Sequence, residues 1–234
     1  MSSVRPDEAT GTVPLESLLQ HPALWRGRQA AVRPTLSSGS ALLDARLPSG
    51  GWPAGGLTEI LTRRAGLGEL RLVLPLLRRL SQQTPPRWVV WVAPPFEPYA
   101  PALQAHGMPL GGQLVVRTHE TAWALEQALE SGACAVALCW GLQTNAAQRA
   151  PMLRRLQWAA QRSGLPVFLF RDLQALREPS TAELRLIFEP LQRGGRVQLI
   201  KSRGGSRAPC EFLWSQFEAV HHGASDCGEG HGAG

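Results

Sequence analysis

The chain has 234 residues, of which 44% are hydrophobic and 18% are charged, and its formal net charge is +6. This length allows one sizeable hydrophobic core with extensions, and no apolar run approaches the ~18 residues that a membrane-spanning helix needs. The opening stretch, MSSVRPDEATGTVP, lacks the apolar centre of a secretory signal. These features argue against membrane and exported classes, so we expect a cytoplasmic protein whose four cysteines stay reduced.

The excess of basic residues permits an acidic partner, such as nucleic acid or an acidic protein face. Lys201 is the single lysine, and all other basic residues are arginines. Codon usage in a high-GC genome produces the same bias, and the arginines are scattered rather than gathered in one block. Composition alone is therefore weak support for DNA binding.

The N-terminal segment combines a polar stretch with a short amphipathic one. Residues 1–14 are polar and rich in small residues, which is typical of a disordered segment. A short helix is expected next, with Leu15, Leu18 and Leu19 on one face, and Trp25 follows it. These four apolar residues either pack on the chain's own domain or contact a partner or a second subunit. They are the candidate partner-binding residues.

From residue 57 onward, strand-like apolar runs alternate with helical patterns. The expected strands are 57–62, 87–93, 112–117, 133–140 and 165–170, and the expected helices are 69–82, 97–106, 120–130 and 146–163. This alternation predicts an α/β fold with a mostly parallel sheet covered by helices. Such sheets bind ligands at the carboxyl ends of their strands.

The C-terminal third has a different texture. Three runs, 184–190, 196–202 and 210–214, read as strands separated by Gly, Ser, Arg and Pro. They predict an antiparallel extension of the sheet. The tail is rich in glycine and holds three histidines and Cys227, but their spacing matches no metal-binding pattern, so no metal site is expected there.

The turn after the first expected strand has the position of a phosphate-binding loop without its residues. A working loop reads GxxxxGK[ST], in which the glycines let backbone amides approach the phosphates and the lysine neutralises them. Aligned on Gly68, the chain reads RRAGLGEL, with Gly66 inside the turn, Glu69 in place of the lysine and Leu70 in place of the hydroxyl. A glutamate beside a triphosphate would cost about 4 kcal/mol at an effective dielectric near 20.

The metal-binding half of such a site is also missing. A P-loop ATPase ends a later apolar strand with an aspartate that organises Mg²⁺. Here the run CAVALCW ends in Trp140, and Gly141 and Leu142 follow it. Two independent requirements are unmet, so we expect neither a cofactor nor an enzymatic activity.

These motifs resemble those of a known family. The stretch SSGSALLDARLPSGGWPAGGLTEI is similar to the segment before the P-loop in RecA recombinases. HPALWRGRQ, LPSGGWPAGGLTEIL and the late KSRGG are more similar to the ImuA family, over about residues 15–214. The central part also resembles SulA, the cell-division inhibitors, which are shorter and lack the HPALWRG to LPSGGWP segment.

The resemblance implies a RecA-like fold with a degenerate P-loop, and an adaptor role in the SOS-induced, mutagenic form of translesion DNA synthesis. The implied partners are an ImuB-like relative of Y-family polymerases and an error-prone DNA polymerase, with RecA as a further candidate. Two other functions stay open. One is a SulA-type inhibitor that binds FtsZ, and the other is a DNA-binding RecA paralogue.

The loop KSRGGSRAP supplies the candidate residues for nucleic acid or an acidic partner. Lys201, Arg203 and Arg207 are interleaved with two glycines that let the backbone approach a phosphate. An exposed hairpin with solubilising charges is the plainer interpretation. We divide the chain into an N-terminal arm (1–40), a RecA-like core (41–219) and a flexible tail (220–234), with DNA contact and self-association as expectations.

Overall fold

The computed structural model describes residues 34–142, 146–202 and 206–217. All of them belong to the larger of the two compact units into which the chain divides, residues 34–234. The candidate residues Leu15, Leu18, Leu19, Trp25 and Arg203 lie outside the described residues, as do the tail and the N-terminal arm up to residue 33.

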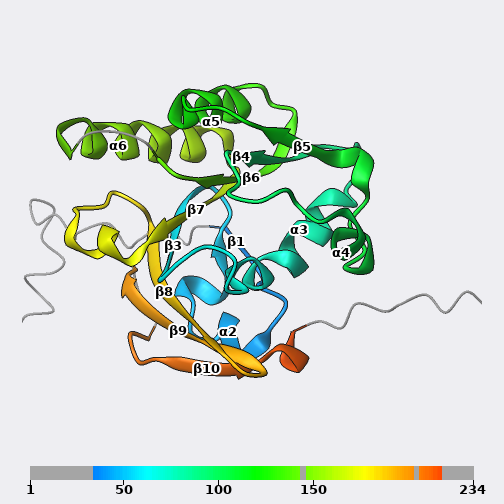
Figure 1. Cartoon of the computed structure of the whole chain (residues 1–234), viewed down its shortest axis with the longest axis vertical. Coiled ribbons are helices and arrows are strands. Elements are labelled where there is room, and N and C mark those ends of the chain that lie inside the picture. The colour runs from blue at the N-terminus through cyan, green and yellow to red at the C-terminus, as the bar shows by residue number, and fades with distance from the viewer. Residues whose placement is uncertain (1–33, 143–145, 203–205, 218–234) are drawn as a thin grey trace, which may run out of the picture. The chain divides into compact units, whose positions relative to one another are not determined.

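An eight-stranded mixed sheet forms the centre of this unit, with the strand order β10-β9-β8-β3-β7-β6-β4-β5 (Figure 1). Its strands are β3 (Gly56–Thr62), β4 (Trp88–Val92), β5 (Gln113–Val116), β6 (Cys134–Trp140), β7 (Pro166–Asp172), β8 (Leu184–Leu191), β9 (Gly194–Lys201) and β10 (Cys210–Leu213). The pairs from β8 across to β5 are parallel, and β8–β9 and β9–β10 are antiparallel. The α/β class and the mostly parallel central sheet are thereby confirmed.

Helices cover both faces of the sheet. The α-helices are α2 (Ala41–Asp44), α3 (Leu74–Ser81), α4 (Ala100–Ala105), α5 (Thr121–Glu130) and α6 (Ala146–Ser163). Leucines of α2, α3 and α4 join one hydrophobic cluster, and apolar residues of α5 and α6 join a second cluster on the opposite face (Figure 1). Within the described ranges, no helix is long and apolar enough to cross a membrane.

Shorter elements connect and flank the sheet. They are the strands β1 (Thr35–Leu36) and β2 (Trp52–Pro53), which pair with each other, and the 3-10 helices η1 (Pro48–Gly50), η2 (Glu69–Leu72), η3 (Leu110–Gly112), η4 (Leu173–Arg177) and η5 (Trp214–Gln216). The small β1–β2 sheet brings Trp52 into the core, where its ring meets Phe168 edge-on, with 5.5 Å between ring centroids.

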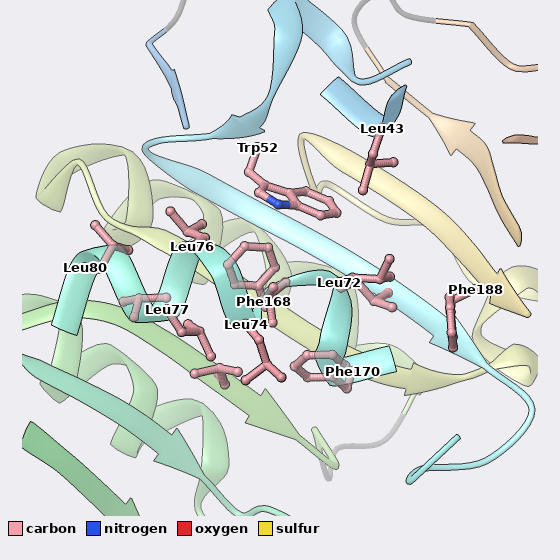
Figure 2. Close-up of a cluster of buried hydrophobic side chains, with 14 of the residues drawn as sticks. Leu43, Trp52, Leu72, Leu74, Leu76, Leu77, Leu80, Phe168, Phe170 and Phe188 are labelled. Carbon is pink, nitrogen blue, oxygen red and sulfur yellow. The ribbon is translucent and has the colours of Figure 1, made fainter. Parts of the chain in front are cut away.

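The α3 side of the core shows why this segment folds as it does. Leu74, Leu77 and Leu80 recur at helical spacing, are buried, and belong to the same hydrophobic cluster as Phe168 and Phe170 of β7 (Figure 2). Each fully buried side chain of this size contributes about 1.5–3 kcal/mol. This burial, more than helix propensity, holds the α3 segment against the sheet.

Two expectations about these elements need correction. The predicted helix 69–82 is divided into η2 and α3, because Pro75 has no N–H to donate and fits only the first turn of an α-helix. The predicted run 184–190 is β8, which is parallel to β3 rather than an antiparallel addition. The antiparallel part begins at β9.

Candidate functional site

The carboxyl ends of β3, β4, β6 and β7 meet at one edge of the sheet, and a pocket of about 370 Å³ lies there. Thr62 ends β3 and Arg64 follows it, Trp140 ends β6, and Phe170 and Asp172 belong to β7. The same lining includes Glu69, so the turn that follows β3 and the end of β6 share one pocket. This is the place where α/β sheets bind ligands, and it is the candidate functional site.

The loop between β3 and η2 is closed by its own carboxylate. Gly66 and Gly68 take left-handed φ values of 82° and 97°, which glycine adopts without strain. The side chain of Glu69 then reaches back, and its carboxylate oxygens accept N–H bonds from Gly66 at 2.9 Å and Leu67 at 2.8 Å. Consecutive amides that converge in this way form an anion-binding nest. In this chain the anion is Glu69, which is 4% exposed.

Charge repulsion by Glu69 is therefore only one of two reasons why this loop should not bind a phosphate. Glu69 does more than oppose an incoming anion, because it already occupies the amides that an anion would use. Leu70, in the place of the hydroxyl residue, packs against the hydrophobic core. Arg63 and Arg64 are exposed, and Arg64 lines the pocket.

Aromatic side chains form the other wall of the pocket. The Trp140 ring stacks on Phe170, with 4.6 Å between centroids and an interplanar angle of 12°, and it lies parallel to Trp91 at 6.1 Å. The last position of β6 is thus filled by a packed indole. In the described ranges 34–142, 146–202 and 206–217, no group of three or more His, Cys, Asp or Glu side chains could hold a metal ion.

A buried ion-pair network under the pocket escaped the sequence reasoning. Glu59 of β3 is fully buried, and its carboxylate contacts Arg171 of β7 at 2.9 Å and Arg185 of β8 at 2.7 Å. Arg171 also pairs with Glu178 at 2.5 Å, and Glu178 pairs with Arg149 of α6. The network joins three adjacent strands to a helix. Its signal in the sequence is an acidic residue inside the strand-like run LTEIL.

The basic loop is only partly described. Lys201 ends β9, and its ammonium donates to the Ser180 carbonyl oxygen at 2.6 Å. Arg207 is exposed. Because Arg203 is outside the described residues, the structure does not bring the three predicted contact residues together, and their joint role stays a prediction.

Sequence comparisons agree with the expected family. Residues 55–165 match the family model described as "Cell division inhibitor SulA". The chain is 35% identical over 149 residues to Protein ImuA of Caulobacter vibrioides strains NA1000 / CB15N and ATCC 19089, covering 59% of this chain and 58% of the relative. It is 33% identical over 122 residues to Cell division inhibitor SulA of Edwardsiella piscicida, covering 51% of this chain and 65% of the relative.

The chain thus spans between 58% and 65% of the length of the curated relatives that it matches. The predicted resemblance to these two kinds of protein is confirmed.

Proposed function

We propose that this chain, which is similar to ImuA and SulA proteins, is a non-enzymatic accessory protein of the DNA-damage response. Its finer role in this proposal is that of an adaptor in SOS-induced translesion DNA synthesis. The adaptor binds an ImuB-like relative of Y-family polymerases and, through it, an error-prone DNA polymerase.

The proposal includes a RecA-like core whose P-loop has lost its ligand. A phosphate-binding loop joins a sheet strand to the helix that follows it, and the loop between β3 and η2 occupies that position. Its glycines keep the turn and its amides keep an anion-binding geometry. The residues that would hold a nucleotide and Mg²⁺ are replaced by Glu69, Leu70 and Trp140.

One observation carries the non-enzymatic part of the proposal: the Glu69 carboxylate is bound to the loop amides. A nucleotide would have to displace a buried carboxylate and then sit beside it, which combines a lost hydrogen-bond pair with charge repulsion. Binding of Mg-ATP is therefore expected to be absent or very weak. Isothermal calorimetry tests this, and a dissociation constant in the low micromolar range would contradict it.

The alternative is a SulA-type inhibitor that binds FtsZ. The match to the SulA family model favours this alternative. It covers residues 55–165, which run from β3 through α6 to the residue before β7. The ImuA matches favour the adaptor role, as do the segment HPALWRG and the strands after residue 180 that a compact inhibitor core does not need.

Side-by-side co-purification decides between the two roles. The tagged full-length chain is co-expressed with an ImuB-like protein and, separately, with FtsZ from the same genome. The adaptor proposal expects a stable complex with the ImuB-like protein and none with FtsZ. The reverse result assigns the SulA-type role, and the absence of both complexes overturns the proposal.

A further inference from the structure

A groove separates α5 from α6 on the outer surface of the sheet's second helical layer. The two helices pack beside each other (Figure 1), and the groove between them has a volume of about 660 Å³. Its apolar lining residues are Pro151, Trp158 and Ala159 of α6. It lies on other elements than the pocket that holds Glu69.

Large aromatic side chains mark this surface. Trp158 is 66% exposed and Trp123 of α5 is 59% exposed, whereas Trp52 and Trp91 are buried in the core. Trp123 precedes Glu126, a groove residue, by three positions, so the two share a face of α5. Tryptophan and arginine are the residues that most often dominate the binding energy of protein interfaces.

The two walls of the groove carry opposite charges. Arg154 and Arg162 lie on the α6 wall, and Glu130 lies on the α5 wall. Arg155 contributes to the α6 wall but is satisfied, because its Nε donates to Glu126 across the groove at 2.9 Å. Among the described residues, neither Arg154 nor Arg162 has an ion-pair partner. Glu130 has no ion-pair partner among these residues either, so two unpaired arginines on α6 face one unpaired glutamate on α5, and the groove keeps an excess of positive charge along α6.

We propose that this groove docks an amphipathic helix of a partner protein, with apolar side chains on Trp158 and Ala159 and carboxylates toward Arg154 and Arg162. The inference rests on the proposed adaptor function and names the surface through which a partner binds. A groove between two packed helices accommodates a third helix, and α6, with 18 residues, is about 27 Å long. A single-stranded nucleic acid fits less well, because it carries a phosphate on every nucleotide and would bring some of them to Glu130 on the α5 wall, whereas an amphipathic helix can place its carboxylates on the α6 side alone.

Fluorescence anisotropy with the full-length protein and labelled synthetic helices tests this surface. The first probe is a peptide of about 18 residues with leucines at helical spacing and glutamates along one flank, which spans about 27 Å as a helix. Its matched twin carries lysines in place of the glutamates, and a third probe is an oligothymidine of similar length. We expect the acidic peptide to bind and the other two probes to bind at least roughly tenfold more weakly.

Groove variants should then weaken the acidic peptide selectively. Trp158→Ala, and Arg154→Glu combined with Arg162→Glu, should each raise its Kd by roughly tenfold or more. Tyr99→Ala and Arg193→Glu are the matched controls, because both residues are exposed and lie on other elements, and they should leave the Kd unchanged. Equal binding of both peptides, tighter binding of the oligothymidine, or groove variants that bind like wild type would each overturn the proposal.

Failure of the groove and failure of the adaptor role give different results. In one case the ImuB-like protein binds to wild type and to the groove variants, and the acidic peptide does not compete with it. The groove is then not the docking site, and the adaptor role stands. If the groove binds the acidic peptide as expected but neither the ImuB-like protein nor FtsZ forms a complex, the docking site stands and the proposed function fails.

Discussion

Two buried glutamates, Glu59 and Glu69, are stabilised in different ways. Glu59 is compensated by two guanidinium groups from the neighbouring strands, whereas Glu69 is compensated by two backbone amides of its own loop. A buried carboxylate without such partners would be strongly destabilising. In both cases the side chain is part of the structure of the candidate site rather than a free reactive group.

Replacing Glu69 should open the anion-binding amides of its loop. Glu69→Ala leaves the N–H groups of Gly66 and Leu67 without their acceptor, so the free energy of unfolding should fall by about 1–3 kcal/mol. Inorganic phosphate should then raise the melting temperature of the variant more than that of wild type, because it restores an acceptor. Glu130→Ala is the control on an exposed glutamate. An identical phosphate response in all three proteins would show that these amides are not an anion site.

Breaking the ion-pair network should be more damaging than breaking a surface pair. Glu59→Gln leaves Arg171 and Arg185 without their shared carboxylate, and loss of one partner from a buried pair costs about 3–5 kcal/mol. Arg196→Ala removes solvent-accessible pairs with Glu189 and Glu211 and should change stability little. Urea denaturation of both variants measures the difference, and equal midpoints would contradict the structural role of the network.

The buried thiol Cys139 predicts a stability loss in alkali. Burial raises its pKa from an ordinary 9.0 to about 12. In the unfolded chain the thiol ionises above pH 9, so its contribution is fully present below pH 9 and is lost as the pH rises toward 12. The free energy of unfolding of wild type should therefore fall up to about 1 kcal/mol per pH unit more steeply there than that of Cys139→Ala. Parallel slopes for the two proteins between pH 9 and 11 would rule this out.

At the scale of elements, patterning predicted most of the parallel sheet and its helices. The runs CAVALCW and LPVFLF are almost wholly apolar and became the central strands β6 and β7, as expected for strands covered on both faces. The parallel pairing of β8 with β3 was missed because strand direction depends on contacts that are distant in the sequence, which local composition does not encode.

The candidate site was predicted in position but not in its contacts. The spacing around Gly68 located the loop, and the end of β6 located Trp140, at one edge of the sheet. The hydrogen bonds of Glu69 depend on the left-handed conformations of Gly66 and Gly68, and the Glu59 network depends on strand neighbours. Neither can be derived from residue types alone.

The pairing of β9 with β10 requires a glycine at position 194, where the two backbones approach closely. A Cβ on Gly194 would overlap the Phe212 carbonyl oxygen, which belongs to backbone and cannot turn aside. Gly194→Ala should therefore lower the free energy of unfolding by about 1–3 kcal/mol, the usual effect of overpacking. Gly111→Ala is the matched control, since nothing lies within 4 Å of its added Cβ. Thermal melts of the two variants compare them, and a Gly194→Ala protein as stable as Gly111→Ala would disprove the close contact.

At the scale of the whole molecule, the net charge of +6 leads us to ask whether the protein binds DNA. If the loop that carries Arg203 and Arg207 contacts phosphates, changing both to Ala should reduce the slope of log affinity against log salt by roughly 1–2. Binding of the ImuB-like protein that we propose as the partner should barely change in the same assay. The rival account has the loop on an acidic face of that partner, in which case the double variant loses the partner and any DNA affinity is unaltered. If neither interaction responds, the loop is a solvated hairpin.

The carboxylate of Glu69 acts as a ligand that the chain carries with it. It is attached three residues from the Gly66 amide that it binds, so its local concentration is set by the tether and not by the surrounding solution. A loop that waits for a nucleotide is ordered only when that metabolite is abundant, whereas this loop is already occupied on folding. A change in nucleotide concentration would therefore leave the shape of the surface around the pocket unchanged.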